Sequence, residues 1–372
     1  MDANALPTID AVFQARLDRL QIVPRLDVLK ELVSEWRSPS TGYRVDEQLA
    51  PIWAEKLRHT FTEVLEVEYT DLDAAEGNVL PIDSSVSPES LIWEYYRVDQ
   101  TGFAAWIDDD GKVMPSGAIK AKRFTGEMHE FGHKYEWTVF DLERAAAVNL
   151  PLSSMKAENA RRAHAEFVNW VWLFGDSGKN LLGLVTHPNI TVSLAPLRSG
   201  GSVDADRLWS LKSNDEILTD LATLIDTVPQ QTGRKEHVAT VFMSLKDAQI
   251  LRRRRLGAGD GTLTLWDFVQ TLWKGDDTGQ PKVSFRVLNE CDPTYRVQPG
   301  VGSDTSGITG RFLLAIPAAN KSKLAFIRAR PFTQRPPQER DFVLYHTTHE
   351  KIGGCKCQVP LAVHRMDFRA TA

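Results

Sequence analysis

His-Glu-Phe-Gly-His at residues 129–133 is the stretch whose residue types and spacing could do chemistry. His-Glu-x-x-His is the zinc-binding motif of many metallopeptidases. It works on a helix, where residues four apart lie on one face and both rings can reach one ion. His129 and His133 would then hold zinc, and Glu130 would be the general base.

The residues around this motif predict a strand instead. Large or apolar side chains alternate with polar ones, at Phe131, Tyr135, Trp137 and Val139. On a strand His129 and His133 would stand roughly 13 Å apart, at about 3.3 Å per residue, which is too far for one ion. The sequence after His133 also offers no matching third ligand. We therefore expect no metal, no cofactor and no catalysis, and a zinc metallopeptidase using His129, Glu130 and His133 is the remote alternative.

The composition is that of an ordinary globular protein. Of 372 residues 42% are apolar, enough for a large core divided among two or three structural units. There is no apolar run long enough for a membrane span and no signal peptide, and a formal charge of −5 excludes a wholly basic nucleic-acid binder. Cys291, Cys355 and Cys357 cannot form a disulfide framework, so we expect a reducing compartment and small core cysteines.

Four other short motifs have simple interpretations. Asp108–Asp110 lacks the ligand spread of a calcium loop, and "GDSGK" at 175–179 lacks the β-barrel context of a serine protease. "GVGSDTSGITG" at 300–310 lacks the Gly-Lys-Ser/Thr end of a phosphate loop. We interpret these three as turns. Arg252–Arg255 we interpret as a solvated helix end that complements the helix dipole, with nucleic-acid contact as the alternative.

Hydrophobic periodicity predicts helices and strands in an unusual order. Short amphipathic helices are expected within residues 8–36 and 46–64, then a long aromatic hairpin over 91–140 whose tip is 108–117. A helix of more than about 30 Å follows from residue 152 to the stop signal at Gly175. The mixed region after it has expected helices at 214–228, 245–255 and 262–273 and expected strands at 237–244, 282–290, 310–317 and within 340–368.

This order of elements and several local motifs resemble the major capsid proteins of tailed bacteriophages with the Hong Kong 97-type fold. The strand "YEWTVF" leads into "ERAAA", the long helix ends in a Gly-Asp turn at Gly175 and Asp176, and "GL" and "HPN" follow at 183–184 and 187–189. The C-terminal "GGCKCQVPLAV" resembles the closing strand of the family. The resemblance is closest over residues 130–190 and rests elsewhere mainly on element order.

The resemblance implies an α+β fold of this type, with boundaries taken from the family. Residues 1–87 would form an N-terminal arm, and residues 88–140 an extended β-hairpin loop. Residues 141–186 and 341–372 would form a peripheral domain that contains the long spine helix. Residues 187–340 would form an axial domain.

The function that the resemblance implies is assembly. Copies of a major capsid protein self-assemble into pentamers and hexamers and close an icosahedral shell around the phage genome. The implied partners are the chain itself, portal, scaffolding or decoration proteins, and packaged DNA held by non-specific contact. The implied location is the virion, after assembly in the host cytoplasm, without a membrane. An encapsulin-like nanocompartment shell, which encloses protein cargo, is the alternative.

The aromatic hairpin supports an assembly role independently of the resemblance. It exposes too much apolar surface for a monomer, and aromatic residues are favoured at subunit interfaces. The alternative is that the hairpin folds back on its own domain. We expect the interface to be formed by Trp93, Tyr95, Phe103, Trp106, Asp109, Lys112 and Phe124.

Covalent cross-linking in this family uses a lysine of the same loop. Lys112, Lys120 and Lys122 are present, but no partner asparagine or catalytic acid matches the family pattern, so we do not predict a cross-link.

Overall fold

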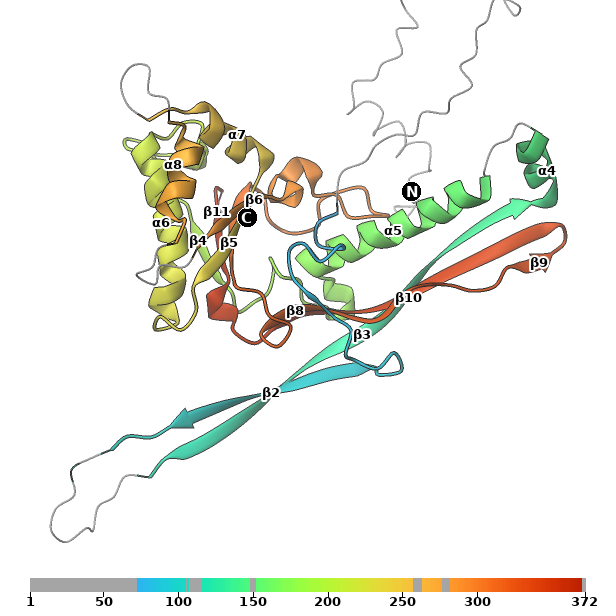
Figure 1. Ribbon diagram of the computed structural model, residues 1–372, viewed down its shortest axis with the longest axis horizontal. Helices are drawn as coiled ribbons and strands as arrows, with labels where there is room; N and C mark the ends of the chain where they lie inside the picture. Colours follow the sequence, from blue (N-terminus) through green and yellow to red (C-terminus); the bar gives the residue numbers. More distant parts are fainter. Residues whose placement is uncertain are drawn as a thin grey trace, which may run out of the picture. The chain divides into compact units, whose positions relative to one another are not determined.

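The computed structural model describes residues 72–104, 106, 116–147, 152–256, 263–275 and 282–369. The helices expected within residues 1–71 and most of the hairpin tip lie outside these ranges. The described residues belong to one compact unit, which contains two β-sheets with their helices (Figure 1).

The first sheet, which we call the long sheet, has six strands in the order β1-β8-β10-β3-β2, with β9 paired to the start of β10. All its neighbouring strands are antiparallel except β1 and β8. Its strands are β1 Ile82–Asp83, β2 Ile92–Thr101, β3 Ala118–Thr138, β8 Leu324–Gln334, β9 Gln338–Arg340 and β10 Val343–Cys357.

Strand β3 belongs to two ladders in succession. It pairs with β2 up to Glu127 and with β10 from Met128 to Thr138. The expected alternation is confirmed, because Tyr135 and Trp137 are buried and their polar neighbours are not. At about 3.3 Å per residue the strand is roughly 70 Å long, so the hairpin and Thr138 stand at opposite ends of it.

Helix α5 (Leu152–Phe174) lies along the long sheet, in contact with β3 and β10 (Figure 1). Its last two turns are buried on all sides, and Trp172 stacks on Phe326 of β8 with ring centroids 4.8 Å apart. Gly175, at φ +75°, ends the helix as predicted. A Cβ atom there would lie 2.4 Å from the carbonyl oxygen of Leu181, so only glycine fits.

Helix α4 (Val139–Ala147), which periodicity did not predict, follows β3 without a loop. The Asp141 N–H donates to Thr138 Oγ1 at 3.1 Å, and the Thr138 N–H donates to Asp141 Oδ2 at 3.3 Å. This reciprocal capping box satisfies free N–H groups at the start of the helix and lowers the pKa of Asp141. Thr-x-x-Asp was therefore the sequence signal for the helix.

The second sheet, which we call the compact sheet, has the order β4-β11-β7-β5-β6. Its central strand β7 is wholly buried, with Leu313 and Ala315 in the core that the compact sheet shares with its helices, and Phe312 and Leu314 in the core shared with α5. Burial on both faces explains the continuous apolar run "FLLAIP". The elements are β4 Thr191–Leu194, α6 Asn214–Gln231, β5 Val238–Met243, α7 Leu245–Arg253, α8 Leu265–Leu272, β6 Ser284–Val287, β7 Phe312–Pro317 and β11 His364–Asp367.

The chain crosses between the sheets twice near its C-terminal end. Strand β8, which periodicity did not predict, lies in the long sheet although it falls within residues 187–340. Strand β11 lies in the compact sheet although it falls within residues 341–372. The other strands and helices expected in the mixed region are confirmed.

Two of the short motifs are turns, as predicted, and the arginine run needs a correction. Residues 177–179 form a single 3-10 turn, and residues 300–310 form turns and bends. Arg252 is solvated at the end of α7, but Arg254 is not. The Arg254 guanidinium donates to carbonyl oxygens within residues 209–212, so this arginine holds a loop against the helix.

Candidate subunit interface

The His-Glu-Phe-Gly-His segment lies in β3 opposite β10, as its alternation predicted. His129 Nε2 lies 3.2 Å from a carboxylate oxygen of Glu127, and Glu130 forms ion pairs with Arg330 and Lys351 at 3.7 and 3.8 Å. Across the described part of the chain, no three His, Cys, Asp or Glu side chains converge on a possible metal position. His129 and Glu130 of the motif therefore make separate contacts within the long sheet.

Gly132 shows why the motif contains a glycine. A Cβ atom at this position would lie 2.5 Å from the carbonyl oxygen of Thr348 on β10. Gly132 pairs with His349 of β10, and the β10 backbone passes too close at this point for a side chain. The glycine serves strand packing.

A buried polar cluster connects α5 to the sheet next to this segment. His164 of α5 lies 3.5 Å from Glu350 Oε2, and Glu350 pairs with Arg328 of β8 at 2.8 Å. His164 Nε2 also lies 3.0 Å from the hydroxyl of Thr348. Burial, and then the neighbouring His164, lowers the pKa of His133. These groups fix the helix to β8 and β10.

The root of the β2–β3 hairpin is anchored on its own chain by Trp93. The indole packs with Met128, Ile327 and Ala329. A Cβ atom at Gly126, the cross-strand partner of Trp93, would lie 2.4 Å from the indole, so the absence of a side chain makes room for the ring. The anchor depends on shape, because a large ring lies over a glycine.

An aromatic ladder continues from Trp93 along the same face. Tyr95 stacks on Phe124 with ring centroids 5.1 Å apart, and the Tyr95 hydroxyl donates to the carbonyl oxygen of Cys357 at 2.9 Å. Burial raises the pKa of Tyr95. Arg97 and Lys122 each lie 5.2 Å from the Phe124 ring centroid, a cation–π distance. This face is thus covered by the chain itself at its root and basic further out.

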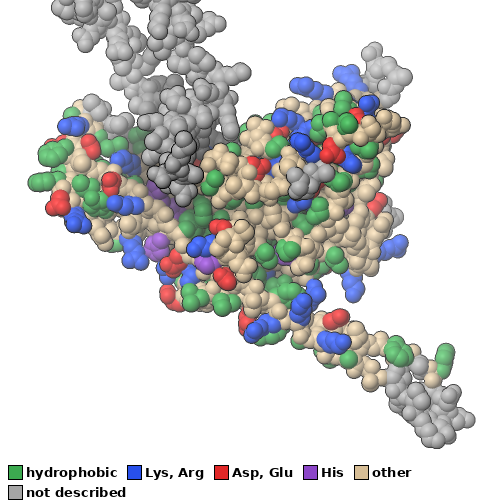
Figure 2. Space-filling view, turned by 180° about the vertical axis from the view of Figure 1, so that it is seen from behind, with side chains coloured by type: hydrophobic (Ala, Val, Ile, Leu, Met, Phe, Trp, Pro, Cys, Tyr) green, Lys and Arg blue, Asp and Glu red, His purple; other side chains and the backbone are tan. Residues whose placement is uncertain are grey.

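The opposite face of the hairpin is uncovered, and it carries large apolar side chains together with the Glu94–Arg123 ion pair. Because side chains alternate along a strand, the even-numbered residues of β2 share this face with the odd-numbered residues of β3. From Tyr96 to Thr101, and from Ala118 to Arg123, every residue is exposed, so the outer half of the hairpin is bare on both sides (Figure 2). We call the following set, each more than half exposed, the apolar face: Ile92, Tyr96, Val98 and Ile119.

The structure distributes the expected interface residues between different surroundings. Trp93, Tyr95 and Phe124 are half-buried on their own chain. Phe103 is exposed, and Trp106 is 99% exposed. Asp109 and Lys112 lie outside the described residues. Ile92, Val98 and Ile119 of the apolar face were missed because aromatic type, not strand parity, guided the expectation. Tyr96 was missed although it is aromatic.

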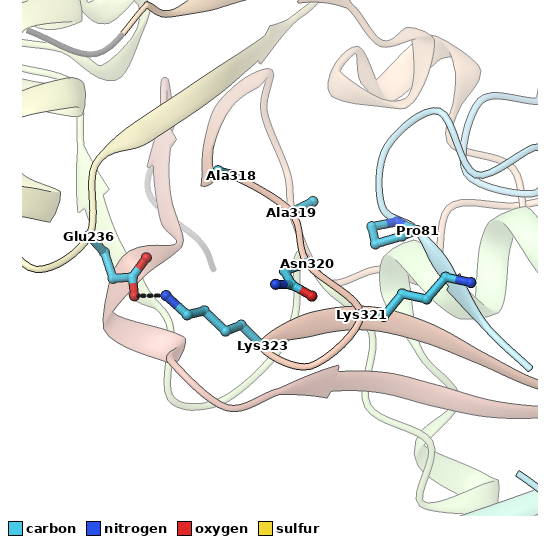
Figure 3. A pocket seen from close by; sticks show the side chains of 7 residues that line it. All are labelled: Pro81, Glu236, Ala318, Ala319, Asn320, Lys321 and Lys323. Atoms are coloured by element: carbon cyan, nitrogen blue, oxygen red, sulfur yellow. Dashed lines mark hydrogen bonds and ion pairs between the residues drawn. The ribbon is translucent and has the colours of Figure 1, made fainter. Parts of the chain in front are cut away.

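A hollow of about 520 Å³ lies where the loop after β7 meets the start of β1 (Figure 3). Glu236 and Lys323 form an ion pair at 2.5 Å across it, while Lys321 points away from this pair. The lining offers no hydroxyl, thiol or imidazole group that could act as a nucleophile. It is formed by Pro81, Glu236, Ala318, Ala319, Asn320, Lys321 and Lys323.

Solved structures with the same fold come from phage capsids. The capsid of Myoviridae phage XM1 aligns with a TM-score of 0.67 at 14% identity, covering 84% of this chain and 97% of that chain. A chain of Gordonia phage Cozz aligns with a TM-score of 0.54 at 12% identity, covering 89% and 97%. A chain of Mycobacterium phage Bobi gives 0.53 at 10% identity, covering 84% and 96%. The fold is therefore that of phage capsid subunits, the Hong Kong 97 type.

A family model described as major capsid protein matches residues 102–368, and the chain belongs to this family. No curated protein matches the sequence. The protein is thus a structural subunit of a capsid shell. This identity agrees with the resemblance seen in the sequence and is favoured over the nanocompartment and peptidase alternatives. In the described part of the chain, no helix has the length and apolarity needed to cross a bilayer.

Proposed function

We propose that copies of this chain form pentamers and hexamers that close an icosahedral shell around a phage genome, with the hairpin of each subunit lying across its neighbour. One observation carries the proposal: the outer half of the hairpin is exposed on both faces, and one of them bears Ile92, Tyr96, Val98 and Ile119. In this arrangement the apolar face rests on the neighbouring subunit.

Energetics favours a partner over an isolated hairpin. A two-stranded ribbon is marginally stable in water by itself. Covering a large apolar side chain is worth about 1.5–3 kcal/mol, so several on one face favour association. The opposite face carries Arg97, Lys120 and Lys122 with Asp99, a composition suited to solvent. We therefore assign the neighbour to the apolar face and solvent to the basic face.

The two sheets suggest domain boundaries that differ from those expected from the family. We assign β8, β9 and β10 of the long sheet, with α4 and α5, to the peripheral domain, and the compact sheet with α6, α7 and α8 to the axial domain. On this division β8 moves to the peripheral domain and β11 to the axial domain. Residues 88–140 remain the extended loop, and residues 1–87 remain the N-terminal arm.

The proposal includes the partners and the location that the family resemblance implied. The partners are other copies, with portal, scaffolding or decoration proteins as further components. Packaged DNA would be held by contacts without sequence preference, since the shell must accept a whole genome. Assembly in the host cytoplasm precedes incorporation into the virion.

The first prediction compares two matched double variants of the hairpin. Val98→Ser with Ile119→Ser removes apolar groups from the apolar face, and we expect the yield of fast-sedimenting particles to fall at least about tenfold, the effect of roughly 1.4 kcal/mol per contact. Asp99→Ser with Lys120→Ser changes neighbouring positions on the other face and should assemble like the wild type. Sedimentation and electron microscopy of the expressed chain measure both.

The controls separate folding from assembly. Both variants should show the circular dichroism spectrum of the unassembled wild-type subunit, because these side chains have no buried contacts. Equal assembly of the two variants would show that the apolar face is not the docking face. Particles that contain protein cargo and exclude DNA would instead support the nanocompartment alternative.

A further inference from the structure

Exposed basic side chains gather beside helices α7 and α8, which contact each other next to the compact sheet (Figure 1). We call the following five residues the basic patch: Arg252, Arg253, Arg255, Lys274 and Lys282. Each is exposed, and none forms an ion pair within the described part of the chain. A cluster of unpaired cations of this kind attracts a negatively charged partner.

A row of aromatic rings joins the parts of the chain that carry the basic patch. The Arg252 guanidinium lies 4.9 Å from the ring centroid of Trp266 on α8, a cation–π distance. Trp266 packs edge-on against Phe285 of β6 with ring centroids 6.4 Å apart, and Phe285 contacts Trp273 with centroids 5.9 Å apart. These half-buried rings pack against the core of the compact sheet, so they hold the end of α7 together with α8 and β6.

The two lysines of the basic patch lie at neighbouring positions at the far end of this row. The Val283 N–H donates to the Trp273 carbonyl oxygen at 2.9 Å. Lys282 precedes Val283 and Lys274 follows Trp273, so this bond brings the two lysines close to each other. Like charges at neighbouring positions destabilise a folded chain. Their retention at one place points to a counter-charge supplied by another molecule.

Helix dipoles explain only part of the basic patch. Arg252 and Arg253 lie in the last turn of α7, and Lys274 lies just beyond the end of α8, where cations are favourable. Arg255 and Lys282 lie outside both helices. Each dipole also acts on its own helix, so the dipoles give no reason for the five cations to share one surface.

Exposed acidic side chains near the basic patch are fewer than its cations. Asp267 of α8 is exposed. Asp215 is also exposed, and it follows Asn214, whose side-chain amide donates to the Arg255 carbonyl oxygen at 3.1 Å. The acidic residue of α7, Asp247, is buried. Three further acidic residues of this part of the sequence lie outside the described ranges: Asp260, Asp276 and Asp277. The described surface is therefore net positive, on a chain whose net charge is −5.

We propose that the basic patch is the surface at which the subunit contacts the phosphate backbone of packaged DNA. The proposal rests on the shell-forming function above, and it places the α7 and α8 side of the compact sheet on the inner surface of the shell. Arginine and lysine bind phosphates without reading the base sequence, as a shell around a whole genome requires. A chain with a net charge of −5 repels DNA as a whole, so contact needs a local basic surface.

The second prediction compares two double variants that remove the same charge from different surfaces. For Lys274→Gln with Lys282→Gln, we expect the affinity of the unassembled full chain for a duplex of about 30 base pairs to fall at least about tenfold at low salt. The slope of log affinity against log salt should become shallower by roughly 2, since each phosphate contact contributes about 0.9. Lys120→Gln with Lys122→Gln changes the basic face of the hairpin and should bind DNA like the wild type. Fluorescence anisotropy of the labelled duplex measures both.

Several outcomes would overturn the proposal. Equal loss of affinity in the two variants would show that only net charge matters, and a wild-type chain that does not bind the duplex at low salt would have no DNA contact. Tighter binding of polyglutamate than of the duplex would assign the patch to an acidic protein. Lys274→Gln with Lys282→Gln should also keep the wild-type unfolding temperature and shell yield, because both side chains are exposed. Loss of shells in this variant would make the patch a subunit contact instead.

The same measurements separate this proposal from the shell-forming function. Failure of the wild-type chain to form any particle, seen by electron microscopy of sedimented fractions, would count against the proposed function. DNA affinity is measured on the unassembled chain, so it reports on the basic patch whether or not shells form.

Discussion

At the residue scale, Trp93 shows how a glycine can decide whether a hairpin is anchored. The third prediction is that Gly126→Ala destabilises the unassembled subunit by about 1–3 kcal/mol, the usual cost of overpacking. The new Cβ atom would lie 2.4 Å from the indole and force the ring off its site. Urea unfolding of the subunit measures the change in free energy.

A double-mutant cycle tests the cause. Trp93→Leu removes the ring, so Gly126→Ala should cost much less in that background. Gly117→Ala, whose Cβ atom has only an ordinary 3.6 Å contact, should have little effect. An equal cost of Gly126→Ala with and without the indole would mean that backbone freedom, and not the fit of the ring, sets the requirement for glycine.

Residue types in the sequence identified the hairpin but not its docking face. Trp93 and Tyr95 were chosen because they are aromatic, yet they lie on the side that their own chain covers. That outcome depends on contacts distant in sequence, such as the Tyr95 hydroxyl with the Cys357 carbonyl oxygen. The positive φ of Phe342, +61° in the turn between β9 and β10, likewise has no local signal, since Arg-Asp-Phe is no turn motif.

At the element scale, hydrophobic periodicity predicted the elements that have one buried and one exposed face. It missed elements in which the two faces do not differ in this way. Strand β3 alternates, and α5 carries an apolar stripe, so both were predicted. Strand β8 begins with four buried residues and continues irregularly, so it showed no period. Its place between β1 and β10 comes from strand pairing that a local pattern cannot contain.

The loop after β4 is an element whose stability depends on one carboxylate. Asp206 accepts from the Arg198 side chain at 2.7 Å and from the N–H groups of Ser202 and Val203 at 3.0 and 3.2 Å. These bonds, with Arg198 first, lower the pKa of Asp206 from 3.8 to about 2. The stabilisation is therefore complete above about pH 4 and is lost as the pH falls through about 2.

The fourth prediction follows from the lowered pKa of Asp206. Asp206→Asn should lower the unfolding temperature of the subunit at neutral pH, because an amide loses the charge-assisted bond to Arg198. The difference from the wild type should shrink between pH 4 and pH 2 as Asp206 becomes protonated. Differential scanning calorimetry across this range measures it. A difference that is constant with pH would show that shape, and not charge, holds the loop.

At the scale of the whole molecule, the surface that we propose for contact between subunits is mainly apolar. The apolar face consists of four large apolar side chains, each more than half exposed. A net charge of −5 on the chain provides only weak repulsion between copies. Shell formation should therefore follow the hydrophobic effect, which weakens on cooling, more than screened charge.

The fifth prediction is that the protein concentration needed for assembly falls on warming from about 5 to 30 °C and changes little with salt. Between about 0.1 and 1 M salt the Debye length falls from about 10 to 3 Å, which would remove most attraction between exposed charges. Light scattering of purified subunits gives the threshold concentration. If instead the threshold rises steeply with salt and does not change with temperature, ion pairs between copies would be the principal contacts, and the proposed role of the apolar face would be wrong.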